Sequence, residues 1–157
     1  MSETLQWQKD SFTVSTDKSL LQIVRIHHFL STQSYWCQGI PKNVVEKAVQ
    51  GSLCFGLYDG DHPEHLQIGY ARVITDSATF AWVCDVYIEP SYRGRGLSKW
   101  MMECLTSHPD LQSLRKIMLG TKDAHRLYEK FGFKATTTPE RWMEIRRDDI
   151  YQKMKTP

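Results

Sequence analysis

Residues 85–98 read Asp-Val-Tyr-Ile-Glu-Pro-Ser-Tyr-Arg-Gly-Arg-Gly-Leu-Ser, and they join two segments with different hydrophobic patterns. The apolar, β-prone run 80–88 ends before Pro90, and an Arg/Gly-rich loop then leads into the helical pattern of 97–102. Glycine lets the backbone adopt a positive φ and approach a ligand, and the first turn of a helix presents unpaired N–H groups. We therefore predict a strand, a turn, an anion-binding loop and a helix. The alternative is a basic surface turn that only caps the helix.

The loop departs from the two common phosphate-binding patterns. A P-loop has four residues between its glycines, and a dinucleotide-binding loop has a third glycine where this chain has Trp100 or Met101. The chain instead has Arg-x-x-Gly-x-small over 93–98, which resembles the coenzyme A loop of the GCN5-related N-acetyltransferase (GNAT) superfamily, with Ser98 in place of the last Gly or Ala. The resemblance implies that the pyrophosphate of acetyl-CoA, the expected co-substrate, is bound by Arg93, Gly94, Arg95, Gly96, Leu97 and Ser98.

A second motif that resembles the same family follows, Ala124-x-x-Leu127-Tyr128-x-x-x-Gly132-Phe133. In the family this helix lies beside coenzyme A, and its tyrosine often protonates the departing thiolate. The resemblance therefore implies that Tyr128 is the general acid, although packing against neighbouring helix residues is the alternative. It also implies further cofactor-binding residues, namely Val86, Tyr87, Ile88 and Asp123.

The hydrophobic pattern predicts strands and helices in the order β, α, α, β, β, β, α, β, α, β, with a further short strand at the end. The expected strands are 12–15, 53–58, 67–75, 80–88, 116–120, one that begins at Phe133 and one at 142–145; the expected helices are 18–31, 41–51, 97–107 and 123–131. Asp17 and Asp123 are the candidate N-caps of the first and last helices. This order predicts a mixed α/β domain. It resembles the GNAT fold over residues 10–147, which implies a mostly antiparallel sheet of six to seven strands flanked by about four helices.

Length and composition suit one globular domain spanning 1–157. The net charge of +2 argues against a broad nucleic-acid-binding surface, and no apolar run is long enough to span a membrane. The four cysteines have no metal-binding spacing and lie mostly in apolar runs, so we expect no metal and a reducing compartment. The N-terminus lacks the basic and apolar regions of a signal peptide, and a cytoplasmic location is expected.

Asp85 is the one charged residue inside an apolar strand, where an ionised carboxylate is costly unless it is paired. It is a candidate general base that takes the proton of an amine, and the alternative is an ion pair with Arg72. The family places its base at differing positions and does not decide between them. Other candidates for the base are Glu46, Asp76, Glu103, His27, His28 and His125, each more typical of a packed or solvated side chain.

The loop between the first two helices shapes the acceptor site in the family, and here it contains Tyr35 and Trp36. These aromatic rings can pack against an amine or its carbon chain, or they can close the core over the helix pair. We therefore expect an acetyl-CoA-dependent N-acetyltransferase that acts on a primary amine, either a small molecule or a peptide, with a homodimer as a possible assembly. The alternative is a non-catalytic module that binds or senses coenzyme A.

Overall fold

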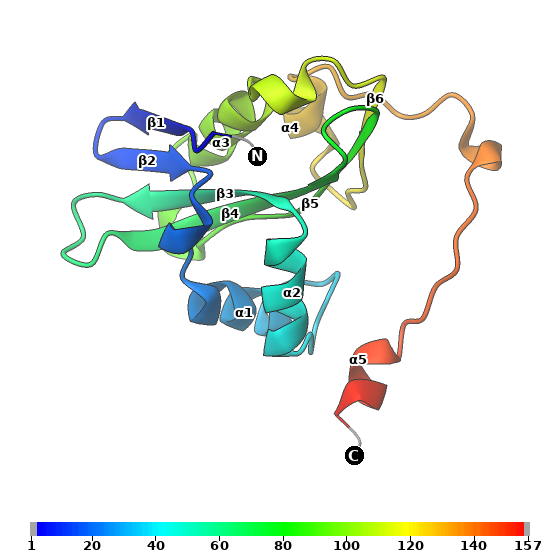
Figure 1. The fold of residues 1–157 in the computed structure, drawn as a ribbon, viewed down its shortest axis with the longest axis horizontal. Helices are drawn as coiled ribbons and strands as arrows, with labels where there is room; N and C mark the ends of the chain where they lie inside the picture. Colours follow the sequence, from blue (N-terminus) through cyan, green and yellow to red (C-terminus); the bar gives the residue numbers. More distant parts are fainter. Residues whose placement is uncertain (1–2, 156–157) are drawn as a thin grey trace.

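A six-stranded sheet, with its strands in sequence order, lies at the centre of the computed structural model, which describes residues 3–155 (Figure 1). All neighbouring strands are antiparallel except β5 and β6, which are parallel. The prediction of a mixed α/β fold with a mostly antiparallel sheet is confirmed. The strands are β1 Gln6–Lys9, β2 Phe12–Ser15, β3 Leu53–Asp59, β4 Leu66–Thr75, β5 Phe80–Ile88 and β6 Lys116–Leu119.

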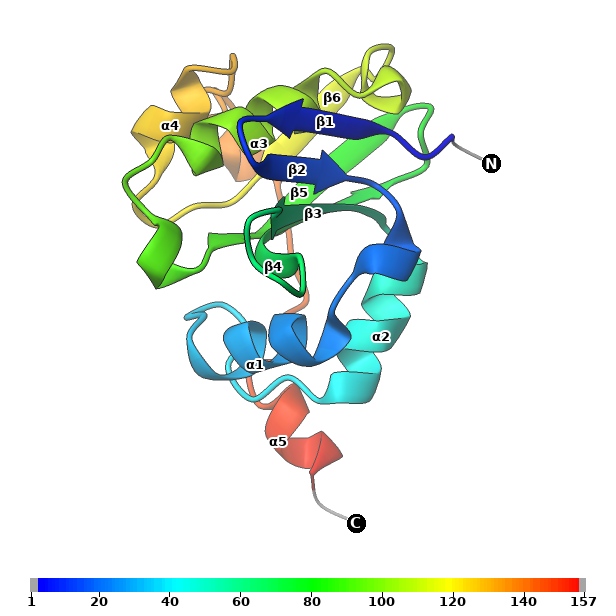
Figure 2. The same ribbon diagram turned by 90° about the vertical axis from the view of Figure 1, so that its left-hand side faces the viewer.

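Helices cover both faces of the sheet. Helices α1 (Ile23–Thr32) and α2 (Lys42–Gln50) lie on one face, and α3 (Leu97–Thr106) and α4 (His125–Glu129) lie on the other (Figures 1 and 2). Each face has its own apolar core, because the side chains of a strand alternate between the two sides. The short helix α5 (Ile150–Met154) is the last helix of the described chain, and its Tyr151 packs against the core on the α1 and α2 face of the sheet.

Helix α3 is held against the sheet by a wide apolar face. Six of its ten residues are buried, among them Met101, Met102 and Leu105, which have no exposed surface. Burying one such side chain contributes about 1.5–3 kcal/mol. The start of α3 is therefore fixed relative to the end of β5, and these two ends carry the glycine loop between them.

Strand β5 is irregular at Asp85. Tyr70 pairs with Tyr87 and Arg72 pairs with Cys84, so two residues of β5 lie opposite one residue of β4. This is a β-bulge, and Asp85 adopts a φ of 53°, which is unusual outside glycine. Strand β6 pairs with β5 only from Phe80 to Val83. The bulge at residues 85–86 therefore lies shortly after Val83, the last residue of β5 that pairs with β6.

The structure corrects the expected ends of two helices. The first helix begins at Ile23 and not at residue 18, because residues 18–20 form a 3-10 turn whose N-cap is Asp17. The last predicted helix is shortened to α4, which begins after Ala124. Asp123 does not cap it: the N–H of Ala124 donates to the side chain of Thr121 at 3.0 Å. The cap prediction for Asp123 was therefore wrong.

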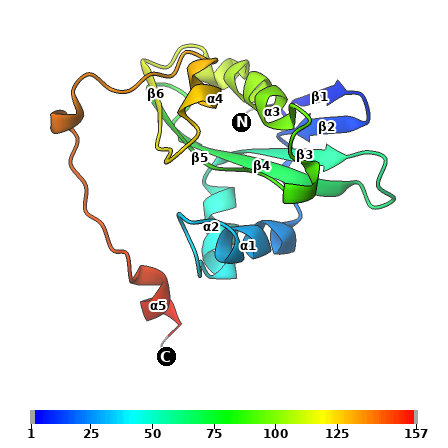
Figure 3. The same ribbon diagram turned by 180° about the vertical axis from the view of Figure 1, so that it is seen from behind.

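The two last predicted strands are absent from the described part of the chain. Residues 133–149, including 142–145, have no strand partner in the described sheet and run along the outside of the domain (Figure 3). The sequence pattern did not reveal β1 or α5. Strand β1 has a single apolar anchor, Trp7, whose ring lies 6.1 Å from that of Phe55. One aromatic residue among polar neighbours is too weak a pattern to predict a strand.

Candidate active site

A cavity of about 460 Å³ lies where β5 and β6 separate. It gathers side chains from three regions of the sequence: the end of β5 with the following loop, the segment around α4, and the loop after α1. Its lining includes ten of the predicted site residues: Tyr35, Trp36, Val86, Tyr87, Ile88, Arg93, Leu97, Ser98, Asp123 and Tyr128. Asp85, Gly94 and Gly96 are each adjacent in sequence to a lining residue, and Arg95 lies between the two glycines, but none of the four is part of the lining.

The glycine loop has the geometry of an anion-binding helix start. Gly94 and Gly96 have φ values of 81° and 75°, and a Cβ atom at either position would meet nothing within 4 Å. A side chain would fit at either position, so glycine is favoured here because it adopts a positive φ without strain. Gly96 is the N-cap of α3, and its carbonyl accepts the N–H of Trp100 at 3.1 Å. This is the first hydrogen bond of α3, so the backbone N–H groups of residues 97–99 have no partner within the helix. They lie at the N-terminal end of α3, which is the positive end of the helix dipole.

The two arginines of the loop have different surroundings. Arg93 donates from Nε to the carbonyl oxygen of Ile88 at 2.9 Å, which ties the loop to the end of β5. The guanidinium of Arg95 lies over the ring of Tyr92, 5.1 Å from its centroid. The Tyr92 hydroxyl donates to Asp59 at 2.6 Å, and this bond raises the pKa of Tyr92. The loop is thus held by β5 on one side and by the end of β3 on the other.

Tyr128 is a buried residue that lines the cavity. Its side chain is buried, and its hydroxyl has no hydrogen-bond partner among residues 3–155. Burial raises the pKa of Tyr128, and the nearby Tyr35 and Asp123 raise it further. Its ring packs at 6.0 Å against Phe133, nearly perpendicular to it. Packing therefore holds the ring, and the hydroxyl stays protonated through the neutral pH range.

Asp85 forms an ion pair with Arg72, which the sequence analysis gave as the alternative to a role as general base. Its Oδ2 atom accepts from Nε of Arg72 at 2.7 Å, and its Oδ1 atom accepts from the indole N–H of Trp36 at 2.9 Å. Arg72 also donates to the hydroxyl of Ser52 at 3.0 Å. The carboxylate raises the pKa of Arg72 against the opposing effect of burial. Both carboxylate oxygens are thus engaged, and Asp85 fixes the position of Trp36.

The other candidates for a general base lie outside the cavity lining. His27 is bonded through Nε2 to the carbonyl of Ile40 at 2.9 Å, and Glu46 pairs with Lys42 on the surface of α2. Asp76 accepts four hydrogen bonds from backbone and side-chain groups of the turn after β4, which hold its pKa well below the usual range. The cavity lining contains Asp123 as its single carboxylate, and no histidine.

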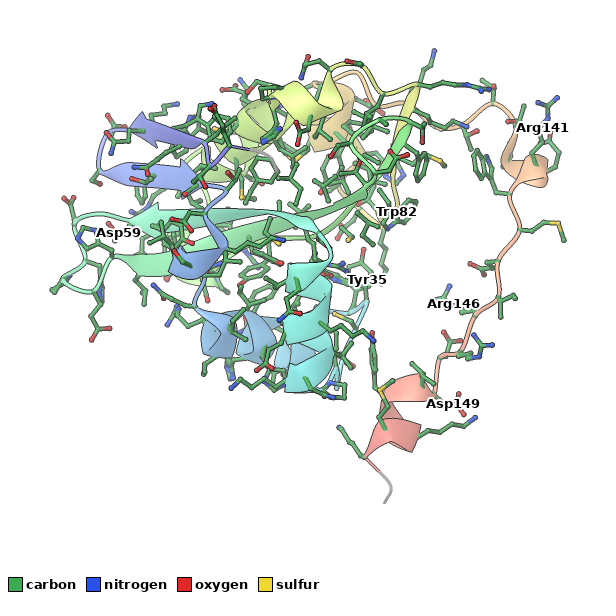
Figure 4. All side chains as sticks on the ribbon, in the orientation of Figure 1. Tyr35, Asp59, Trp82, Arg141, Arg146 and Asp149 are labelled. Atoms are coloured by element: carbon green, nitrogen blue, oxygen red, sulfur yellow. The ribbon has the colours of Figure 1, made fainter. Side chains whose placement is uncertain are left out.

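Four aromatic residues from α1, the loop after it and β5 form what we call the aromatic wall of the cavity, namely Phe29, Tyr35, Trp36 and Tyr87. Tyr35, labelled in Figure 4, packs edge to face against Trp36 at 5.1 Å. Its hydroxyl accepts the N–H of Lys122 at 3.2 Å. Beneath them Phe29 and Tyr87 stack at 3.8 Å with an interplanar angle of 8°. The loop after α1 is thereby joined to the segment before α4 across the mouth of the cavity.

Sequence reasoning missed several lining residues. Phe29 lies within the predicted helix 18–31 and is also a buried core residue of α1, so its sequence position gives no separate signal of a site. Gln33 and Tyr92 lie in short connections with no recognisable pattern. Within residues 3–155, no group of three His, Cys, Asp or Glu side chains is arranged to hold a metal ion, and no helix there is long and apolar enough to cross a bilayer.

Comparison with known proteins assigns this arrangement to one family. The family model of the acetyltransferase (GNAT) domain matches residues 50–135. A Gibberella zeae protein described as a candidate acetyltransferase is 37% identical, over 79% of this chain and 79% of that protein. The crystal structure of a candidate GNAT acetyltransferase from Xanthomonas campestris is 43% identical, with a TM-score of 0.85 over 92% of this chain and 99% of that one.

A more distant structure has the same fold. It is a candidate acetyltransferase from Clostridium acetobutylicum, solved with acetyl-CoA. It is 16% identical to this chain, with a TM-score of 0.58 over 86% of this chain and 94% of that one. At this identity the match supports the fold alone.

Replacing Asp85 with Asn should lower the free energy of unfolding by about 3 kcal/mol, because Arg72 then stays buried without its counter-ion. Asparagine tolerates the positive φ of this position, so the change isolates the charge. Urea denaturation followed by circular dichroism measures the effect. Glu46→Gln is the matched control, since it breaks an exposed ion pair worth about 1 kcal/mol or less. Equal losses in the two variants would show that the buried pair stabilises no more than a surface pair.

Proposed function

Because this chain belongs to the GNAT family of acetyltransferases, we propose that it transfers an acetyl group from acetyl-CoA directly to a primary amine. One observation carries the proposal: a single cavity joins the glycine loop at its anion-binding end to the unpaired hydroxyl of Tyr128 and to the aromatic wall. A thioester held by the loop would thus lie between a proton donor and a surface suited to an amine.

In the proposed complex the pyrophosphate of acetyl-CoA binds at residues 93–98. The free N–H groups at the start of α3 and the loop arginines supply hydrogen bonds and positive charge. The pantetheine arm runs along Val86–Ile88, where β6 no longer covers the edge of β5. Membership of the GNAT family, which generally uses acetyl-CoA, supports this choice of co-substrate.

In the proposed reaction the nitrogen lone pair of the amine attacks the thioester carbonyl, and a backbone N–H of 86–88 stabilises the oxyanion. When the C–S bond breaks, Tyr128 gives its proton to the leaving thiolate. Its raised pKa suits this role, because an acid must keep its proton until that step. The ammonium proton leaves to water in the open cleft, while Asp85 acts in the acceptor half by positioning Trp36.

The co-substrate assignment is tested by Gly96→Asp. The new carboxylate would occupy the phosphate position and repel it, and we expect acetyl-CoA affinity to fall by at least about tenfold, which corresponds to 1.4 kcal/mol. Isothermal titration calorimetry measures the dissociation constant. Gly132→Asp is the control, because Gly132 has a similar positive φ and open surroundings but lies outside the loop. Equal affinities of the wild type and the Gly96 variant would contradict the loop assignment.

Tyr128→Phe tests the general acid. The phenyl ring keeps the packing against Phe133, so acetyl-CoA affinity should stay within about twofold, while kcat should fall by about 100-fold or more. The measurement is the release of coenzyme A thiol with a panel of primary amines, together with calorimetry. A parallel loss of folding and binding would instead support a packing role. A wild type that binds acetyl-CoA but acetylates no amine in the panel would support the coenzyme A-binding alternative.

The pH dependence gives a separate test of Tyr128. The acid is active while protonated, and burial raises its pKa above the ordinary value of about 10, so it should lose its proton only above that pH. The rate with saturating amine should therefore show no basic limb between pH 7 and about 10. A profile of kcat against pH measures this. A fall in kcat between pH 7 and about 10 that is absent from the Tyr128→Phe variant would contradict a raised pKa of Tyr128.

A further inference from the structure

The lining of the cavity contains two charged residues, Arg93 and Asp123. Arg93 belongs to the glycine loop and is tied to the carbonyl of Ile88, so its charge lies in the part of the cavity assigned to the pyrophosphate. Within residues 3–155 the carboxylate of Asp123 forms no hydrogen bond and no ion pair, and it does not cap α4. The cavity therefore has one negative charge that the fold itself does not use.

Asp123 lies close to both the aromatic wall and Tyr128. The hydroxyl of Tyr35 accepts the N–H of Lys122, the residue before Asp123, at 3.2 Å. Burial is the main cause of the raised pKa of Tyr128, and the charges of Tyr35 and Asp123 add to it, so both groups are near enough to affect Tyr128. A cation bound at Asp123 would thus lie beside the proton donor proposed for the reaction.

The other charges around this part of the cavity leave room for one cation. Asp85 lies outside the lining, and both of its carboxylate oxygens are engaged by Arg72 and Trp36. The ammonium group of Lys122 lies over the ring of Tyr35, 5.5 Å from its centroid, and forms no ion pair with Asp123 in the described part of the chain. A second cationic group on an acceptor would therefore find no carboxylate to pair with it.

Tyr35 and Trp36 provide open ring surface beside this carboxylate. They are 56% and 41% exposed, whereas the other two rings of the aromatic wall are buried and stack on each other. The indole N–H of Trp36 donates to Asp85, and the hydroxyl of Tyr35 accepts from Lys122, so the polar groups of both rings are already engaged. The surface suits a flat apolar group and offers few partners to the hydroxyl groups of a sugar.

Resting on the N-acetyltransferase function proposed above, we propose that Asp123 binds the ammonium group of the acceptor, and that the acceptor is a monoamine with a flat apolar body, such as an arylalkylamine. Its ring packs against Tyr35 and Trp36 and covers surface that they expose. Once the amine has lost one proton to water, the carboxylate accepts a hydrogen bond from a remaining N–H group. This role differs from the cofactor-binding role that the family resemblance implies for Asp123.

A comparison of four amines tests the acceptor class. Release of coenzyme A thiol is measured at saturating acetyl-CoA with 2-phenylethylamine, spermidine, glucosamine and phenylalanine. We expect kcat/KM for 2-phenylethylamine to exceed the values for spermidine and glucosamine by about tenfold or more. Phenylalanine has the same ring with an added carboxylate, and repulsion by Asp123 should lower kcat/KM by about 100-fold. Equal or higher values for spermidine or glucosamine would overturn the assigned acceptor class.

Asp123→Asn separates the ammonium site from the cofactor site. Asparagine has nearly the same shape and Asp123 is exposed, so the variant should fold normally. The KM for 2-phenylethylamine should rise by about tenfold or more, because a charge-assisted hydrogen bond is lost. The dissociation constant of acetyl-CoA, measured by calorimetry, should stay within about twofold. An unchanged KM would overturn the role of Asp123, and a weaker acetyl-CoA affinity would instead support the cofactor-binding role.

Glu129→Gln is the matched control for the loss of charge. It removes an exposed carboxylate from α4 that lies outside the cavity lining, and neither the KM for 2-phenylethylamine nor the affinity for acetyl-CoA should change. A rise in KM as large as that of Asp123→Asn would show that net charge, and not contact with the acceptor, causes the effect, and would overturn the proposal.

Reversal of the charge at Asp123 gives the sharpest contrast. Asp123→Lys should attract the carboxylate of phenylalanine, so the ratio of kcat/KM for phenylalanine to that for 2-phenylethylamine should rise by about tenfold or more over the wild type. An unchanged ratio would show that Asp123 does not face the acceptor. A wild type that acetylates spermidine or glucosamine but not 2-phenylethylamine would keep the N-acetyltransferase function and overturn this acceptor class, whereas a wild type that acetylates no amine would overturn both.

Discussion

The buried ion pair between Arg72 and Asp85 stabilises the bulge on which the site depends. The bulge places Asp85 at a φ of 53°, a conformation that costs energy for any residue with a side chain. The pair with Arg72 and the bond from Trp36 offset that cost and hold β5 in its altered register. The strand then separates from β6, and the cavity lies in the space between them. The ion pair thus joins a local distortion of one strand to the shape of the site.

The same network places the two halves of the cleft relative to each other. Asp85 is next to Val86 in the strand that leads to the glycine loop, and it also holds the ring of Trp36 in the opposite wall. The Tyr35 contact with Lys122 closes the other side of the mouth, just before α4 and Tyr128. A shift in the loop after α1 would therefore change the position of both the aromatic wall and the segment that leads to Tyr128.

The sequence allowed the glycine loop and the helix of Tyr128 to be predicted, because both consist of consecutive residues with a fixed spacing. The sequence also predicted most of the helices and strands, because their apolar residues recur at the spacing typical of a helix or a strand. The bond between Trp36 and Asp85 joins residues 49 positions apart, and no local pattern encodes it. The strand predicted at 142–145 was wrong: the segment pairs with no strand of the described sheet, although its Trp142 lies beside Lys116 at the start of β6. Both the bond that was not predicted and the strand that was predicted wrongly depend on contacts between distant parts of the chain, which a local sequence pattern does not contain.

The parallel pairing of β5 and β6 also determines when the cleft can form as the chain folds. The connection between these strands contains the glycine loop and all of α3, and its ends meet only when residues 116–119 reach β5. Contacts that close a long segment of chain form slowly, because their loop entropy is lost before the pairing compensates for it. The antiparallel strands β1–β5 can assemble earlier through shorter connections. A growing chain on the ribosome would thus have most of its sheet before the cleft exists, and the cleft would form only when the domain is complete.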